Sequence, residues 1–321
     1  MDRFVIEGGR RLRGKLAIGG AKNAALPIMA ACLLSEGTSR IDAAPNLADV
    51  EHMGSLLGEL GVRVEREGDR LELTVEDESS SAARYDLVRK MRASVCVLGP
   101  LLANRGRARV AMPGGCAIGS RPIDIHLRGL EALGAKVELE GGDIIATADR
   151  LTGGEVFLGG PFGSTVTGTA NIMMAAALAE GTTVIECAAC EPEIQDLAEF
   201  LTAMGARISG VGSPRVVIEG VDRLTGTAHR VVPDRIEAGT FMVAAAITNG
   251  EVTLNNCRLD HLLAVVDRLR HIGVNVESED GTVTVSSARR LAPVDVVTQP
   301  FPGFPTDLQA QLMALLCLAD G

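Results

Sequence analysis

The sequence contains very few aromatic residues and carries a surplus of negative charge. Among its 321 residues there is no Trp, one Tyr and seven Phe, and the formal net charge is −10. With so few rings the core must be aliphatic, and stacking platforms for single-stranded nucleic acid are not expected. The negative charge also argues against general binding to nucleic acids or membranes, which are themselves anionic. An anionic ligand would therefore need a local cluster of Arg and Lys.

Long apolar runs are absent as well. Residues 1–10 show no basic segment followed by an apolar stretch, so no signal peptide is expected. Apolar stretches such as residues 170–179 are too short to span a bilayer. Seven Cys is an odd number, and most lie in apolar segments, which is typical of reduced thiols in a cytoplasmic protein. Cys187 and Cys190 form a CxxC pair without a second pair or a His cluster, so no metal site is expected.

A repeat of about 70 residues runs along the chain. Four segments read as an amphipathic helix that ends in Gly and precedes a strand, and these glycines are almost evenly spaced. Leu stands four residues before each glycine, and apolar residues stand one and eleven before it. Eight residues before, only the second segment breaks the apolar stripe, with His126. We expect a left-handed conformation at the four glycines, which are Gly61, Gly134, Gly205 and Gly273.

Each repeat also has an earlier helix that is apolar nearly all round, so it should be buried. One such unit cannot bury its own faces, and several must pack together in an α/β arrangement. The length favours two domains. These earlier helices end near Gly37, Gly106, Gly181, Gly250 and Gly321. Because Gly321 lies four repeat lengths after Gly37, we expect four units and half of a fifth, as in a truncated piece of a longer protein.

The segment PGGCAIGSRP, Pro113–Pro122, is an insertion in the second repeat. In each repeat one glycine ends the buried helix and another ends the amphipathic helix. The distance between these two glycines is almost the same in three repeats and clearly longer in the second, which contains this segment. The fold does not need the extra residues, because the other repeats close the same connection with short turns. An insertion of this kind favours a functional interpretation over a structural one.

Charged and polar residues stand at the predicted starts of the buried helices. Helix N-termini present free N–H groups and suit anions, so converging ends could bind phosphate and carboxylate. The basic residues concerned are Lys22, Arg92, Arg121 and Arg235.

Structural interpretations of these residues remain open. Asp307 follows Thr306 in a turn, where either could simply cap a helix. Arg92 and Arg235 could form surface ion pairs, and His126 could be a hydrogen-bonded core residue. Glu191 precedes a helix, where an acidic residue is favoured by the helix dipole.

Five segments together resemble the family of UDP-N-acetylglucosamine enolpyruvyl transferases (1-carboxyvinyltransferases), within the EPSP synthase-like superfamily. They are GAKNAALPIMAACLL, YDLVRKMRASV, PGGCAIGSRPIDIHLRGLEALGA, VVPDRIEAGTFMVAAA and FPTDLQAQ. The resemblance covers the whole chain in the family's order. It implies an inside-out α/β barrel with two pseudo-threefold domains of three repeats each. The first domain would comprise residues 22–231 and carry the Cys segment. The second would comprise residues 1–21 and 232–321 and remain incomplete, with about one and a half repeats.

The resemblance also implies a reaction. The enolpyruvyl group of phosphoenolpyruvate is transferred to the 3′-hydroxyl of UDP-N-acetylglucosamine, and phosphate leaves. This is the first committed step of peptidoglycan precursor synthesis, hence of cell wall biogenesis, cell shape and cell division, and it needs no metal or organic cofactor. The expected partners are these two small molecules, with no nucleic acid and no membrane, and the oligomeric state is left open.

Site residues follow from the same resemblance. Cys116 matches the proton donor that also forms a covalent adduct, and Asp307 matches the candidate base that contacts the sugar. Lys22, Asn23 and Arg121 match the phosphoenolpyruvate site. His126 adjoins the nucleotide-sugar contacts, and Glu191 and Arg235 match polar positions at the family's interdomain cleft whose roles are less defined. The nucleotide-sugar contacts match Asn23, Arg92, Arg121, Pro122, Ile123, Asp124, Ile125, Gly163 and Asp307.

The chain departs from the family at one stretch. Some members carry Lys and Ser that touch the diphosphate, whereas residues 159–162 are Gly-Gly-Pro-Phe here, which puts the side-chain contacts in doubt. Two other hypotheses stay open. One is the sister enzyme that acts on shikimate 3-phosphate. The other is a non-catalytic fragment or ligand binder, because the family's C-terminal stretch, with further arginines and an Asp, is missing; in that case activity would be low.

Overall fold

The computed structural model describes residues 3, 5–112, 123–161, 163–287 and 290–321. It divides into two compact units, one formed by Gly20–Val232 and the other by Met1–Gly19 together with Pro233–Gly321. The assignment of the units to a complete and an incomplete three-repeat domain stays a prediction.

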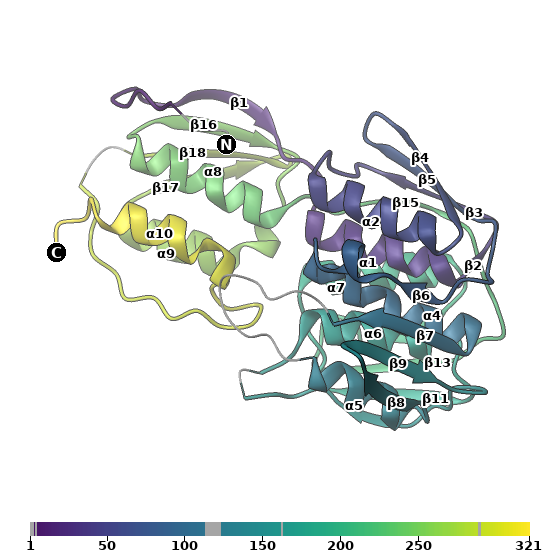
Figure 1. The fold of residues 1–321 in the computed structure, drawn as a ribbon. Coiled ribbons are helices and arrows are strands. Elements are labelled where there is room, and N and C mark those ends of the chain that lie inside the picture. The colour runs from purple at the N-terminus through teal and green to yellow at the C-terminus, as the bar shows by residue number, and fades with distance from the viewer. Residues whose placement is uncertain (1–2, 4, 113–122, 162, 288–289) are drawn as a thin grey trace. The chain divides into compact units, whose positions relative to one another are not determined.

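The unit Gly20–Val232 contains three four-stranded sheets with one topology (Figure 1). In each sheet an edge strand runs parallel to its neighbour, and the other two pairs are antiparallel. In sheet order, the strands are β15 (Ala228–Arg230), β3 (Thr38–Asp42), β5 (Arg70–Val75) and β4 (Val62–Glu67); β6 (Ala82–Ala83), β7 (Arg107–Ala111), β9 (Asp143–Thr147) and β8 (Lys136–Glu140); and β10 (Glu155–Phe157), β11 (Thr182–Glu186), β13 (Arg215–Glu219) and β12 (Arg207–Ser209). A short parallel pair joins β2 (Ser35–Glu36) and β14 (Leu224–Thr225).

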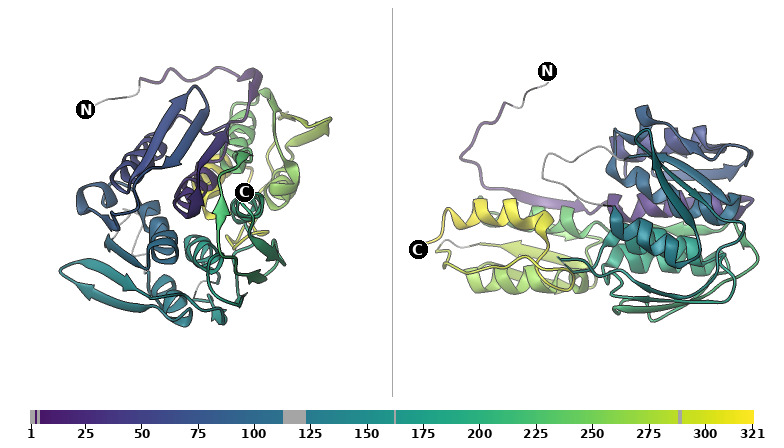
Figure 2. Two further views of the ribbon diagram at one scale, coloured as in Figure 1. Left: turned by 90° about the vertical axis from the view of Figure 1, so that its right-hand side faces the viewer. Right: turned by 60° about the horizontal axis from the view of Figure 1, so that its bottom comes forward.

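The helices of this unit form two sets. Those predicted to be buried are indeed buried, and they pack on one another. They are α1 (Lys22–Ala31), which η1 (Cys32–Leu34) continues, η2 (Arg92–Val97) with α4 (Leu98–Arg105), and α6 (Val166–Ala176). The amphipathic set comprises α2 (Ala48–Glu59), α5 (Asp124–Ala132) and α7 (Pro192–Ala203), and α3 (Tyr85–Val88) is a single turn. The left view of Figure 2 shows helices of this unit nearly end-on, with strands outside them.

The other unit repeats the same topology once. Its sheet has the order β1 (Arg13–Ala17), β16 (Glu251–Asn255), β18 (Thr282–Ser286) and β17 (Asn275–Glu279), and β1 runs parallel to β16. Its helices are α8 (Arg235–Ile247), η3 (Leu259–His261), α9 (Leu263–Ile272), η4 (Thr306–Leu308) and α10 (Gln309–Leu316). The predicted α/β fold, built from one repeated unit, is therefore confirmed.

The helix-ending glycines behave as their position predicts. Gly61, Gly134, Gly205 and Gly273 all have positive φ, between 81° and 112°. L-residues rarely adopt this conformation, so glycine is the residue that lets each amphipathic helix turn into its strand. The leucines four residues earlier are fully buried at 0% exposure in all four repeats.

One predicted helix begins differently. The segment that starts at Arg92 opens as six residues of 3₁₀ helix before α4 begins at Leu98. Pro100 weakens α-helical bonding here, because it has no N–H to donate to the carbonyl of Cys96, but α1 contains Pro27 and is α-helical from its first residue. Gly99, the residue before Pro100, packs so closely on α6 that a Cβ there would lie 2.3 Å from the backbone oxygen of Asn171.

Candidate functional site

The buried helices begin where the charged and polar residues stand. Lys22 is the first residue of α1, Arg92 is the first of η2, and Thr167 is the second of α6. These three helices contact one another. Lys22 and Arg92 are half-buried, whereas Asn23 is exposed. The start of each helix thus keeps polar atoms accessible, while the rest of the helix is covered by apolar neighbours.

Lys22 has a partner that its sequence position did not reveal. Its Nζ lies 2.8 Å from Oδ2 of Asp49, which stands in the first turn of α2. Both side chains keep about a third of their surface exposed, at 37% and 33%. An ion pair this accessible contributes little to stability, and an anionic ligand could share or replace the carboxylate.

Helix α5 brings several predicted residues to one place. Ile123 precedes the helix and is buried, Asp124 is its first residue and is exposed, and Ile125 is half-buried. Ile125 reaches the segment that follows β10, since a Cβ on Gly160 would lie 2.8 Å from Ile125 Cδ1. Gly160 and Gly163 exchange two backbone hydrogen bonds, of 2.9 and 3.1 Å, and Gly163 has a φ of +95°. Two stretches predicted to contact the nucleotide sugar therefore lie side by side.

His126, which breaks the apolar stripe of the second repeat, is 2% exposed. Its Nδ1 lies 2.9 Å from Asn171 Nδ2, and its Nε2 lies 3.2 Å from Thr167 Oγ1. Burial, followed by the positive charge of Arg92, lowers the pKa of His126 from 6.5 to about 4, against a smaller opposing effect of Asp124. The imidazole is therefore neutral at physiological pH, and Arg92, Asp124 and His126 are electrostatic neighbours.

Glu191 and the thiol beside it occupy the start of α7. Glu191 is the residue before the helix and is 8% exposed. Cys190 is half-buried, and burial, with a smaller effect of the Glu191 charge, raises the pKa of its thiol. Such a thiol is protonated at neutral pH and is a weak nucleophile.

Other thiols are less reactive still. Burial raises the pKa of Cys32 and of Cys96 to about 12, and that of Cys257 to about 11. Cys116, Arg121 and Pro122 lie outside the described residues, so the predicted proton donor and its neighbouring arginine are known only from the sequence.

Arg235 and Asp307 belong to the unit formed by Met1–Gly19 and Pro233–Gly321. Arg235 is the first residue of α8, and its guanidinium carbon lies 5.8 Å from the ring centre of Phe301. Asp307 is exposed in η4, ahead of α10. Both residues stand at the start of a helix, as Lys22 and Arg92 do in the other unit.

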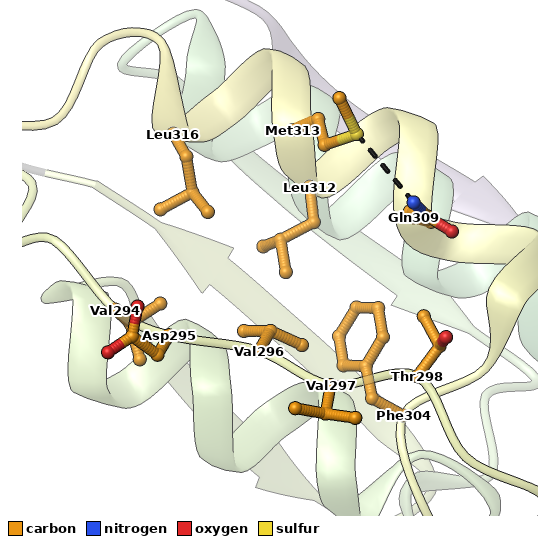
Figure 3. A pocket seen from close by; sticks show the side chains of 10 residues that line it. All are labelled: Val294, Asp295, Val296, Val297, Thr298, Phe304, Gln309, Leu312, Met313 and Leu316. Carbon is orange, nitrogen blue, oxygen red and sulfur yellow. Dashed lines mark hydrogen bonds between the residues drawn. The ribbon is translucent and has the colours of Figure 1, made fainter.

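A pocket of about 460 Å³ also lies in this unit (Figure 3), but it contains no predicted site residue. Apolar side chains of α10 form one wall, and the segment 294–298 with Phe304 forms the other. The lining comprises Val294, Asp295, Val296, Val297, Thr298, Phe304, Gln309, Leu312, Met313 and Leu316.

Within the described part of the chain, no group of three or more His, Cys, Asp or Glu side chains is placed to hold a metal ion. Among the same residues, no helix is long and apolar enough to cross a membrane.

The sequence-based interpretation missed three residues of this region. Thr167 occupies the same repeat position as Asn23, Arg92 and Asp307, so its place in the repeat could have identified it, although it carries no charge. Asn171 lies one turn further along α6 in an apolar run, where a buried amide is uncommon. No sequence signal connects Asp49 to Lys22.

Comparison with known proteins adds a family to this geometry. Residues 6–321 match the model of the EPSP synthase (3-phosphoshikimate 1-carboxyvinyltransferase) family. The chain is 50% identical to the UDP-N-acetylglucosamine 1-carboxyvinyltransferase of Desulfosudis oleivorans and 54% identical to that of Anaeromyxobacter sp. (strain K). Both matches cover 100% of this chain and 76% of the relative.

Solved structures show the same fold. The enolpyruvyl transferase NikO from Streptomyces tendae superposes with a TM-score of 0.87 at 22% identity, over 98% of this chain and 75% of that one. EPSP synthase from Acinetobacter baumannii gives a TM-score of 0.69 at 21% identity, over 91% of this chain and 68% of that one. At these identities the likeness shows the fold alone, which is the inside-out α/β type that was predicted.

Proposed function

This chain belongs to the EPSP synthase family of carboxyvinyl transferases, and from that premise we propose that it transfers the enolpyruvyl group of phosphoenolpyruvate to the 3′-hydroxyl of UDP-N-acetylglucosamine. The observation that carries the proposal is the identity of 50 and 54%, over the whole chain, to relatives named for that acceptor. The sister reaction with shikimate 3-phosphate is less well supported, because the likeness to EPSP synthase structures is at 21% identity. In a bacterial cytoplasm the proposed reaction would begin peptidoglycan precursor synthesis.

The reaction requires a proton donor at carbon 3 of phosphoenolpyruvate. Protonation there makes carbon 2 electrophilic, and the sugar hydroxyl then attacks carbon 2 and loses its proton. Departure of phosphate, with loss of a proton from carbon 3, restores the double bond in the product. We assign the first role to Cys116, since a thiol is mostly protonated at neutral pH and acidic enough to donate. We assign Asp307 as the acceptor of the hydroxyl proton.

The substrates carry several negative charges, which need fixed positive partners. We assign Lys22, Asn23 and Arg121 to phosphoenolpyruvate. Arg92 suits an anionic oxygen, because it stands at the first turn of a buried helix beside a neutral imidazole. A charged His126 would repel the cation, so the low pKa of His126 preserves the field of Arg92.

The nucleotide sugar would contact the start of α5 and the turn after β10. We assign Asn23, Arg92, residues 121–125, Gly163 and Asp307 to it, with His126 adjoining. Backbone groups around Gly163 would take the place of the Lys and Ser side chains that some family members use, although the N–H groups of Gly160 and Gly163 themselves donate to each other's carbonyls.

Phosphate release from phosphoenolpyruvate, measured with each acceptor in turn, tests this proposal. We expect release with UDP-N-acetylglucosamine and none above background with shikimate 3-phosphate. Release only with shikimate 3-phosphate would contradict the proposed acceptor. Binding of UDP-N-acetylglucosamine, measured by calorimetry, provides a second readout that does not depend on turnover.

A further inference from the structure

Every polar atom of the Asn171 side chain is engaged inside the protein. Its Oδ1 accepts a hydrogen bond from the Gly99 amide at 2.8 Å, and its Nδ2 donates to the Val95 carbonyl at 2.9 Å. The same Nδ2 lies 2.9 Å from Nδ1 of His126. Asn171 is 0% exposed, so water does not compete for these bonds. The residue joins α6 to η2, α4 and α5 at one point.

These partners determine which way the amide faces. The Gly99 amide can only donate and the Val95 carbonyl can only accept, so the oxygen and nitrogen of Asn171 cannot be exchanged. The two N–H groups of Nδ2 then have different acceptors: one donates to the carbonyl of Val95 and the other to Nδ1 of His126. A neutral imidazole that accepts at Nδ1 carries its proton on Nε2. The structure therefore defines the tautomer of His126.

The tautomer in turn sets the role of Thr167. Its Oγ1, 3.2 Å from His126 Nε2, must accept the proton of the imidazole. The hydroxyl hydrogen of Thr167 then points away from His126. Among the described residues Oγ1 has no other hydrogen-bond partner, and the side chain is half-buried at the first turn of α6. The Thr167 hydroxyl is therefore available as a hydrogen-bond donor. It lies next to His126, whose pKa is lowered in part by the positive charge of Arg92.

We propose that Asn171 is a positioning residue for nucleotide-sugar binding: it fixes the Nε2–H tautomer of His126, which directs the Thr167 hydroxyl to donate to an oxygen of the ligand. The ligand in this inference rests on the proposed function, whereas the hydrogen-bond geometry does not. Asn171 acts through His126 and Thr167 and does not touch the ligand itself.

Nitrogen NMR of the imidazoles tests the first half of the inference. In the unaltered chain, His126 should show a protonated Nε2 and an unprotonated Nδ1, with its signals identified by their loss in His126→Gln. Asn171→Asp supplies a carboxylate that only accepts, so the proton should move to Nδ1 and Thr167 should donate to Nε2 instead. A protonated Nδ1 in the unaltered chain would overturn the inference.

Calorimetric titration with UDP-N-acetylglucosamine tests the second half. Thr167→Val removes the donor with little change of shape and should weaken binding about ten-fold, as expected for one hydrogen bond to a charged oxygen. Thr167→Ser keeps the hydroxyl and should restore most of the affinity. Asn171→Asp should weaken binding by a similar factor, although it places a carboxylate in the core; if it does not fold, the Thr167 pair carries the test.

Thr202→Val is the matched control. Thr202 is an exposed helical threonine of α7 whose hydroxyl donates to the Ala198 carbonyl, so its loss should leave the affinity unchanged. If Thr167→Val binds UDP-N-acetylglucosamine as tightly as the unaltered chain does, this inference is overturned while the proposed function stands. Failure of the unaltered chain to bind UDP-N-acetylglucosamine would overturn the proposed function, and this role of Thr167 with it.

Discussion

The second and third repeats of the chain fold alike but differ at a few positions. Both form a four-stranded sheet of the same order, and both bury a leucine at 0% exposure four residues before the helix-ending glycine, Leu130 and Leu201. Between the first long strand and the amphipathic helix, however, the connection is longer in the second repeat, from β7 to α5, than in the third, from β11 to α7. At the position that Leu197 occupies in the third repeat, the second has His126.

The comparison separates fold from function. The third repeat shows that the sheet and its helix form without an insertion and without a buried histidine, so neither is required for folding. Features that the two repeats share should therefore control stability at neutral pH, and the insertion and His126, which only the second of them has, should affect ligand binding and turnover. The predictions below test this separation.

The largest effect is expected at Cys116, inside the insertion. Cys116→Ser should abolish phosphate release, because serine is too weak an acid to protonate phosphoenolpyruvate, and the free energy of unfolding should stay unchanged. Cys116→Asp should retain part of the activity, since a carboxylic acid can take over proton donation. Equal loss in both variants would indicate that the thiol acts chiefly through its covalent adduct.

Truncation of a shared core residue should have the opposite effect. Leu130→Ala should lower the free energy of unfolding by about 2 to 5 kcal/mol, through lost burial and the cavity left behind, without changing affinity for UDP-N-acetylglucosamine. Leu201→Ala, the equivalent change in the third repeat, should cost a similar amount. Urea unfolding monitored by circular dichroism measures both. If either variant kept the free energy of unfolding of the unaltered chain but lost affinity for UDP-N-acetylglucosamine, the shared leucines would not act through stability, and the separation would be wrong.

A pH-dependent contribution to stability should come from His126 and disappear with it. The pKa of His126 is held at about 4 in the folded chain, below its ordinary value of 6.5. Between these values the unfolded chain binds a proton at this residue and the folded chain does not, so the free energy of unfolding falls as the pH drops from 6.5 towards 4. The difference between the two pKa values corresponds to about 3 kcal/mol.

The control for this effect is His126→Gln, which cannot titrate. Its free energy of unfolding should depend less on pH in this window than that of the unaltered chain, as measured by urea unfolding at several pH values. If the free energy of unfolding changed equally with pH in the two chains, His126 would not be the source of the effect.

Much of the fold could be predicted because the sequence repeats it. Counting between glycines placed the starts of the buried helices closely, as for Lys22 in α1 and Arg92 in η2. The repeat could not predict which strand completes each sheet. The first sheet takes its edge strand, β15, from the end of its unit, while β1, near the start of the chain, pairs with the distant β16. These pairings depend on tertiary packing that no local pattern encodes.

The candidate site was predictable only where the chain departs from its repeat or resembles the family. His126 was noticed because it breaks an apolar stripe. Asn171 was missed because its partners, Val95, Gly99 and His126, come from other helices that are distant in the sequence. Asp49 was missed for the same reason.

The most direct test of this separation is the intact mass of the chain after incubation with phosphoenolpyruvate. The unaltered chain should gain the mass of one covalent adduct, Cys116→Ser should gain none, and Cys190→Ser, which alters a half-buried thiol of the third repeat, should gain one as the unaltered chain does. An adduct that persists in Cys116→Ser, or that is lost only in Cys190→Ser, would contradict the assignment of the chemistry to the second repeat.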